Sequence, residues 1–96
     1  MRLKLYSSHS PRDFPHLVAV QHPSLDILPT VLVCPLKTGE ALTEVRTTLN
    51  WKGESFIVLC DLLRPIHRQT LTEIGDVDEK TSNAIIEKVL TLLALP

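Results

Sequence analysis

The sequence predicts a mostly β domain of the α+β class, in which short antiparallel strands are followed by one C-terminal helix. Leu3 and Leu5 alternate with the charged residues Arg2 and Lys4, which is the period-2 pattern of a half-buried strand. Further short runs rich in β-branched residues are bounded by prolines, which suits strands and disfavours helices. Apolar residues recur at helical spacing beyond Gly75, where the predicted helix begins.

Composition places the chain among ordinary small globular proteins. Of its 96 residues, 44% are hydrophobic and 22% are charged. A chain of this length is too short for two independent cores, so we expect a single domain spanning residues 1–96. The formal net charge of −1 gives no long-range attraction for a phosphate backbone, which makes nucleic acid a poor default partner. The N-terminus has no signal-like apolar stretch, and no run approaches the length of a membrane span. We therefore expect a cytoplasmic protein.

The predicted strands occupy the first three quarters of the chain. Residues 7–15 form a polar connection with prolines after the first strand. Lys52-Gly53 lies between two β-prone runs, which favours a tight hairpin. Pro65 favours an edge position because proline cannot donate to a β ladder. The expected strands are one around Leu3 and Leu5, then residues 17–21, 30–36, 45–51 and 55–60, and a short one within 64–71.

The helix is predicted from about residue 79 to about residue 94. Ile85, Val89 and Leu92 lie along one stripe of such a helix. Asp76, with Glu79 three residues later, has the pattern of a capping box. Apolar residues at positions 86 and 90 widen the stripe beyond one contact face, which fits deep burial or an additional contact between subunits.

The two cysteines are expected to be structural. Cys34 and Cys60 each lie in an apolar run, where a thiol usually behaves as a small buried hydrophobe. Cys60, Asp61 and His67 include the residue types of a thiol nucleophile with a base, but the leucines around Cys60 indicate a setting that does not activate a thiol. We therefore expect no catalytic cysteine.

The histidines near the N-terminus show no spacing typical of a metal or catalytic site. His9, His16 and His22 lie in or beside proline-rich loops, where a solvated imidazole is the simplest expectation. Three glycines provide no phosphate-binding loop. The sequence thus predicts no metal, no cofactor and no catalytic residue.

Three runs near the N-terminus resemble, in order and without a gap, the opening of the CcdB family of toxin-antitoxin plasmid-addiction toxins. A turn at residues 53–56, the pair at 74–75 and the closing helix continue the likeness over nearly the whole chain. The resemblance implies a small, partly open β-barrel with a C-terminal helix, a homodimer, and a cognate antitoxin with a disordered acidic tail. The three runs are Met1-x-Leu3-Lys4-Leu5-Tyr6, Leu17-Val18-x-Val20-Gln21 and Val33-x-Pro35-Leu36.

The resemblance further implies the toxin of a type II module that maintains plasmids by binding a protein rather than by catalysis, with DNA gyrase as the candidate target. Family members that poison gyrase end their helix in Trp-Gly-Ile. This chain departs there, because an alanine replaces the large indole that would anchor an interface, and we expect gyrase poisoning to be reduced or altered. The target-binding candidates are His22, Ser24, Leu25, Ala94, Leu95 and Pro96.

A basic patch is the candidate antitoxin-binding surface. Arg64, His67 and Arg68 lie within five residues of one another, and the guanidinium fork suits the carboxylates of an acidic partner. The same residues also fit an interpretation as ordinary solvated charges. The sequence leaves both interpretations open.

Two alternatives compete with the gyrase-binding hypothesis. One is a ribonuclease toxin of the MazF and PemK type, which shares the barrel and places an arginine two residues before an aspartate on a strand. Leu59 stands two residues before Asp61 here, so the cation for RNA cleavage is missing at that point, and we expect no enzyme activity. The other alternative is an inactive barrel that survives as a binding module.

Overall fold

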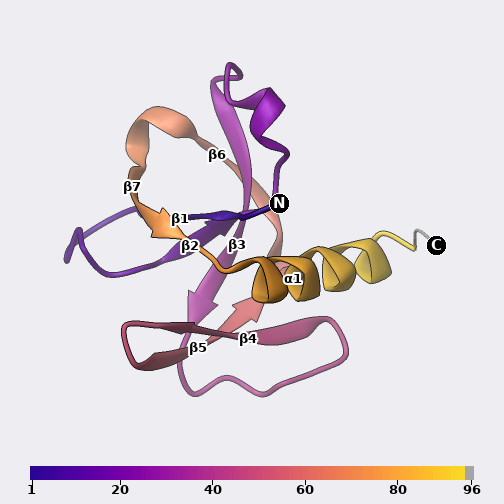
Figure 1. Cartoon of the computed structure of the whole chain (residues 1–96). Helices are drawn as coiled ribbons and strands as arrows, with labels where there is room; N and C mark the ends of the chain where they lie inside the picture. Colours follow the sequence, from indigo (N-terminus) through magenta and orange to yellow (C-terminus); the bar gives the residue numbers. More distant parts are fainter. Residues whose placement is uncertain (95–96) are drawn as a thin grey trace.

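The structure is a computed structural model that describes residues 1–94. It confirms the predicted fold class: antiparallel strands curl into a half-barrel that is followed by a single C-terminal helix (Figure 1). The strands are β1 (Lys4–Ser7), β2 (Leu17–Ala19), β3 (Thr30–Lys37), β4 (Arg46–Trp51), β5 (Glu54–Leu59), β6 (Arg64–His67) and β7 (Thr72–Asp76). The helix is α1 (Glu79–Leu92), and three short 3-10 turns are η1 (Pro23–Leu25), η2 (Cys60–Leu62) and η3 (Arg68–Thr70).

Strand β3 organises the sheet because it has three partners along its length. Its first half pairs with β6, its middle with β2 and its last residues with β5. The ladder runs in the order β4-β5-β3-β2-β1-β7, with β6 beside β3. Every neighbouring pair is antiparallel. The apolar run predicted as a strand at residues 30–36 therefore occupies the centre of the sheet.

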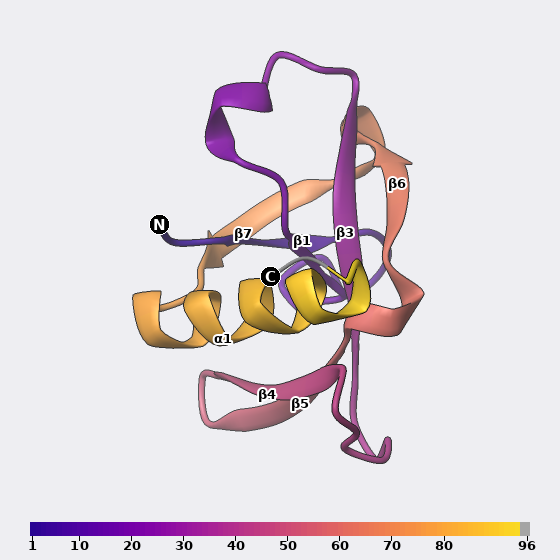
Figure 2. The ribbon, with the colours of Figure 1, turned by 90° about the vertical axis from the view of Figure 1, so that its right-hand side faces the viewer.

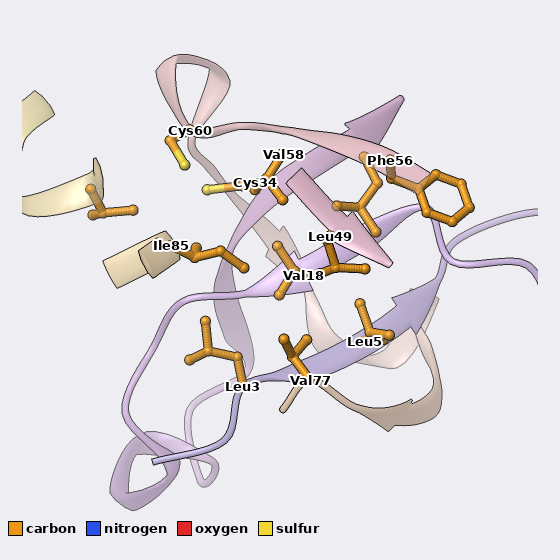
Figure 3. Packing of buried hydrophobic residues seen from close by; sticks show 12 residues of the cluster. Leu3, Leu5, Val18, Cys34, Leu49, Phe56, Val58, Cys60, Val77 and Ile85 are labelled. Carbon is orange, nitrogen blue, oxygen red and sulfur yellow. The ribbon is translucent and has the colours of Figure 1, made fainter. Parts of the chain in front are cut away.

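Two apolar clusters lie on the two faces of this curled sheet. The larger one fills the space between the sheet, the β4–β5 hairpin and α1, and its side chains converge from all three (Figure 3). The smaller one contains Tyr6, Leu17 and Val33, and it is closed by Ile66 and Leu71 from the β6–β7 region. Adjacent residues of one strand, such as Leu5 and Tyr6, are thus both buried, because the sheet is covered on both faces.

The helix lies between β1 and the β4–β5 hairpin in both views (Figure 1 and Figure 2). Ile85 and Val89 face the core, as predicted. The cap differs from the prediction: Asp78, not Asp76, accepts hydrogen bonds from the amide and hydroxyl of Thr81, at 2.7 and 3.0 Å. Asp76 instead ends β7. Within residues 1–94, no helix has the length and apolar character needed to cross a membrane.

Strand β7 is absent from the sequence-based prediction because Gly75 looks like a break. In the structure, Gly75 lies within a strand and makes room for a side chain, because a Cβ at this position would overlap the ring of Trp51. The missing side chain lets the indole lie directly against the backbone of β7. The predicted hairpin turn is confirmed, with Lys52 and Gly53 at φ values of 49° and 83°, both in the left-handed region that such turns require.

Both cysteines are buried, as predicted. Cys34 and Cys60 are fully enclosed in the larger cluster, and Figure 3 shows their sulfur atoms directed toward one another. The hydrogen bond to Cys60 and burial together raise the pKa of the Cys34 thiol. Cys34 is therefore protonated, whereas the same hydrogen bond lowers the pKa of Cys60, which is enclosed in the apolar cluster.

One buried hydroxyl joins the two ends of the fold. Ser82 Oγ accepts a hydrogen bond from the Leu3 amide at 3.0 Å and donates to the Val77 carbonyl at 3.3 Å. We expect Ser82→Ala to lower the free energy of unfolding by about 1–3 kcal/mol, because the buried amide would lose its acceptor. Thr91→Ala removes an exposed hydroxyl that bonds within the helix, and it serves as the matched control in urea unfolding. Equal midpoints for the two variants would contradict this role of Ser82.

Candidate functional site

A cavity of about 300 Å³ opens beside the β1–β2 connection. Its polar lining combines two imidazoles with two cationic side chains, and its apolar wall comes from the paired strands β2 and β3. Because imidazole and cationic side chains line the same cavity, we take it as the candidate functional site. The lining residues are Ser8, His9, His16, Leu17, Pro35, Leu36, Lys37 and Arg64.

The β1–β2 connection is held together by the buried hydroxyl of Ser7. This oxygen lies 3.0 Å from the His9 carbonyl oxygen, 3.2 Å from the Pro11 carbonyl oxygen and 3.2 Å from Nδ1 of His16. The His16 amide also donates to the Tyr6 carbonyl at 3.0 Å, which continues the β1–β2 ladder by one step. The ends of the connection are therefore fixed by buried groups at the edge of the barrel.

The rings of His9 and His16 stack, with centroids 3.6 Å apart and planes inclined by 23°. Burial, the neighbouring His9 and the Arg12 guanidinium lower the pKa of His16 below its ordinary value of 6.5. His9 is exposed, and its Nδ1 lies 2.9 Å from the Ser8 hydroxyl, which leaves Nε2 available to a ligand. The two rings thus occupy different environments although they touch.

A hydrogen bond from Ser8 assigns the tautomer of His16. The Ser8 amide donates to Nδ1 at 3.2 Å, so Nδ1 holds a lone pair and the proton of the neutral ring is on Nε2. A neutral imidazole held in this way donates a hydrogen bond through Nε2 and does not accept a proton there. His16 is therefore suited to holding an oxygen atom of a ligand, and His9 is suited to proton transfer.

Two cations complete the lining. Lys37 is the last residue of β3 and Arg64 the first of β6, the strand that pairs with the other end of β3. Both side chains are exposed. A pair of cations beside a hydrogen-bond donor can hold a phosphate group and stabilise negative charge that develops on it.

Asp61 has an arginine partner after all, although that arginine does not stand two residues before it. Arg46 of β4 binds the carboxylate with two parallel hydrogen bonds, from Nε at 2.9 Å and from Nη2 at 3.0 Å. This pairing lowers the pKa of Asp61. Arg46 Nη1 also donates to the Ala41 carbonyl at 3.3 Å and lies 3.7 Å from Glu40. All its nitrogens have partners, which indicates a structural brace between β4 and η2.

The predicted target-binding residues do not gather in one place. His22 caps η1, with its Nδ1 2.9 Å from the Ser24 hydroxyl and 3.0 Å from the Ser24 amide that donates to it. Leu25 is exposed at the end of that turn. Ala94 follows α1 with a φ of 58°. Leu95 and Pro96 lie outside the described residues.

The predicted antitoxin patch divides between two surroundings. Arg64 lines the cavity, whereas Arg68 is engaged elsewhere, donating to the Leu28 and Thr30 carbonyls at 3.0 and 3.4 Å and pairing with Asp26 at 3.8 Å. Arg68 therefore holds the loop between β2 and β3. The exposed His67 lies between these two arginines on β6.

Sequence reasoning missed His9, His16 and Lys37 as site residues. The order of the two predicted strands and the loop between them could have indicated that His16 lies near the end of β1. If β1 and β2 are neighbouring antiparallel strands, the residues just after the first and just before the second must face each other. The register Tyr6↔Leu17 then brings Ser7 opposite His16. The approach of Lys37 and Arg64 depends on the pairing of β3 with distant strands, which no local pattern gives.

Comparison with solved structures shows the fold. The chain is similar to an endoribonuclease in complex with its cognate antitoxin from a mycobacterial species, with a TM-score of 0.78 and 16% identity over 98% of this chain and 93% of that one. It is also similar to the Mycobacterium tuberculosis toxin MazF-mt6, with a TM-score of 0.76 and 17% identity over 100% and 99% of the two chains. A chain of the Deinococcus radiodurans MazE–MazF complex gives 0.73 and 14% over 99% and 92%.

Neither a protein-family model nor a curated protein matches the sequence. The barrel of toxin-antitoxin systems is thus supported, while the assignment to CcdB is not confirmed and these neighbours favour the MazF alternative. Two of the similar structures are named as endoribonucleases. The prediction that the chain is not an enzyme is therefore wrong, and action on gyrase has no support from these neighbours.

The environment of His16 gives a direct test by NMR. We expect its titration midpoint below about 6.5, because a half-buried ring next to His9 and Arg12 resists taking up a second proton. The unfolded chain takes up that proton first, so this ring's contribution to stability falls as the pH is lowered through about 6.5. The ¹⁵N shifts should report the Nε2–H tautomer.

The variant His9→Asn should raise the midpoint of His16, because it removes the neighbouring ring that repels a second charge. His22→Asn is the matched control, since His22 caps a different turn and contacts neither ring. A midpoint at or above about 6.5 in the unmodified protein, or an Nδ1–H tautomer, would contradict the arrangement described for His16.

Proposed function

We propose that the chain is the toxin of a type II toxin-antitoxin module and that it cleaves single-stranded RNA. The observation that carries the proposal is the cavity that two stacked histidines and two cations line together. RNA cleavage at the ribose needs a proton acceptor for the 2′-hydroxyl, a proton donor for the leaving oxygen, and positive charge near the phosphate. The lining offers side chains for all three tasks, and the barrel is one on which endoribonucleases are built.

His9 is the general base of the proposed reaction. Its exposed Nε2 takes the proton of the ribose 2′-hydroxyl, and the 2′ oxygen attacks the adjacent phosphorus. The bond between that oxygen and phosphorus forms as the bond from phosphorus to the 5′ oxygen breaks. The products are a 2′,3′-cyclic phosphate and a 5′-hydroxyl, so no other reactant is needed.

The remaining tasks fall to Lys37, Arg64 and His16. The leaving 5′ oxygen takes its proton from the Lys37 ammonium, because the guanidinium of Arg64 does not give up a proton in proteins. Arg64 and the Nε2–H of His16 donate to the non-bridging phosphate oxygens, where negative charge develops. The lowered pKa of His16 keeps its ring in the form that this role requires.

The overall charge of −1 does not oppose this function. Attraction for a phosphate acts over roughly a Debye length, about 8 to 10 Å in physiological salt, so the charges near the cavity matter more than the sum over the chain. Arg12, Lys37 and Arg64 lie at or near the cavity. The part of the surface that would meet the RNA phosphate therefore carries positive charge, although the whole chain is slightly acidic.

The proposal is tested with purified protein and single-stranded RNA. We expect cleavage that leaves 2′,3′-cyclic phosphate ends, and a rate that falls by about 100-fold or more in His9→Ala and in Lys37→Met, because each change removes a proton-transfer group. His22→Ala, which alters a histidine outside the cavity, and Asp61→Asn, which breaks the structural brace, should retain the rate if folded. Full activity of His9→Ala, or loss of activity in folded Asp61→Asn, would move the active site elsewhere.

We propose that a cognate antitoxin silences the toxin by laying an acidic, disordered segment over Arg64 and His67. Carboxylates on that segment would occupy the place of the RNA phosphate, so binding and cleavage would exclude each other. Support comes from the similar structures, in which toxins of this barrel are complexed with antitoxins. Arg68 has a smaller part in this proposal, since its guanidinium is already engaged.

We also propose a homodimer built on the outer face of α1. Leu62 of η2, Leu90 of α1 and Leu93, which caps α1, are exposed by 49%, 37% and 53%, and η2 and α1 contact each other. Light scattering at about 10 µM should give a dimer mass, and Leu93→Glu should give a monomer because a charge would enter an apolar contact. Leu42→Glu, at a leucine exposed by 62% in another loop, is the matched control. A monomer mass for the unmodified chain would exclude the dimer.

A further inference from the structure

A second, smaller cavity lies on the other side of the β1–β2 connection. Its volume is about 160 Å³, and it is bounded by the residues after Ser10 in that connection and by the β4–β5 hairpin. Three aromatic side chains and three charged ones share the lining, a composition unlike that of the phosphate-binding cavity. The lining residues are Pro11, Asp13, Phe14, Pro15, Trp51, Lys52, Glu54 and Phe56.

The two cavities are neighbours because Phe14, which lines the smaller one, lies beside His16, which lines the larger one. Its ring centroid lies 5.5 Å from that of His16 and 5.4 Å from that of Phe56, the latter in an edge-to-face arrangement. The polypeptide between His9 and His16 therefore has the proposed catalytic group on one side and an aromatic cavity on the other. This contact between the two linings fits a nucleotide whose phosphate lies beside His16 and whose base enters the second cavity.

The size of the cavity suits one six-membered ring. A closed apolar cavity of about 150 Å³ holds a benzene molecule, so an open concave site of about 160 Å³ offers room for a pyrimidine and leaves part of a purine outside. Trp51 and Phe14 provide flat aromatic surfaces, which bind bases of any sequence through their π faces. Shape thus discriminates by ring size, and aromatic contact provides affinity.

The charged rim selects between the pyrimidines. Asp13 and Glu54 are acceptors, and carboxylates pair with the exocyclic amine of cytosine, whereas the O4 of uracil would face them with a second negative atom. Lys52 Nζ lies 5.5 Å from the centroid of the Trp51 ring, which holds an ammonium donor at the cavity for the base O2.

The indole itself has an unused donor. Trp51 Nε1 is buried and has no acceptor among residues 1–94, whereas most buried donors in proteins are paired. The ring is held in place by the backbone of β7 at Gly75. The cavity wall therefore contains a fixed aromatic group whose hydrogen-bonding capacity no described protein group satisfies.

From the position, size and lining of this cavity we infer that it binds a single pyrimidine base of the substrate RNA, with cytosine preferred to uracil. The inference rests on the proposed function for its biological meaning, because it makes this cavity the place where the sequence of the cleaved RNA is read. Binding of the base itself does not require that the chain cleave anything, so the two proposals can fail separately.

Trp51 is the only tryptophan of the chain, so its fluorescence reports this cavity alone. The probes are cytidine, uridine and adenosine 5′-monophosphates, titrated into the unmodified protein, because a mononucleotide has no internucleotide phosphodiester bond that could be cleaved. We expect cytidine monophosphate to change the emission with an affinity about tenfold higher than that of adenosine monophosphate, with uridine between them. Glu54→Gln should remove most of the preference for cytidine over uridine, and Glu44→Gln, the same change outside the cavity, should not.

A second arm uses RNA oligonucleotides with one varied base and the protein with His9 intact. Cleavage that follows the fluorescence preference, and that loses this preference in Glu54→Gln but keeps it in Glu44→Gln, supports the inference. Equal emission changes for cytidine and adenosine monophosphates, or equal behaviour of the two glutamine variants, overturn it even if RNA is cleaved. Base-selective binding without any RNA cleavage overturns the ribonuclease and leaves the pyrimidine site standing.

Discussion

The candidate site depends on one buried hydroxyl, that of Ser7. A hydroxyl has a single proton to donate, yet Ser7 Oγ lies within hydrogen-bonding distance of three acceptors in the β1–β2 connection. Because the side chain is completely buried at the end of β1, these contacts fold the connection back over the edge of the sheet instead of leaving it in solvent. The stacking of His9 on His16 depends on that folded-back path, and the Ser8 amide within it sets the tautomer of His16.

The rest of the site is assembled by the long strand β3. Its pairing with β2 places Pro35 and Leu36 under the histidines, its end contributes Lys37, and its pairing with β6 brings Arg64 alongside. The two cations come from distant positions in the sequence, which explains why the chain carries a local positive surface although acidic and basic residues nearly balance. Because salt screens electrostatic attraction over short distances, a ligand responds to the charges near its binding site more than to the net charge of the chain.

Local pattern predicted the elements better than their arrangement. Alternation in β1, the hairpin at Lys52-Gly53 and the apolar stripe of α1 are each determined within a few residues, so they can be recognised from the sequence. The position of Gly75 in a strand, by contrast, depends on its contact with the indole of Trp51 from another strand. Sequence alone does not show this contact, so the glycine resembles a break between elements. The bidentate pair of Arg46 and Asp61 escapes prediction for the same reason, because the arginine lies on β4, away from the residues that precede the aspartate.

The contact between Trp51 and Gly75 also fixes a dimension. With no side chain on the glycine, the outer end of the Trp51 ring lies directly against the backbone of β7. The barrel can neither narrow there without crushing the indole nor widen without opening a gap beside it. The Trp51 ring thus helps to set the spacing between the β4–β5 hairpin and β7. A group bound against this ring would contact a surface whose position is fixed by the main chain.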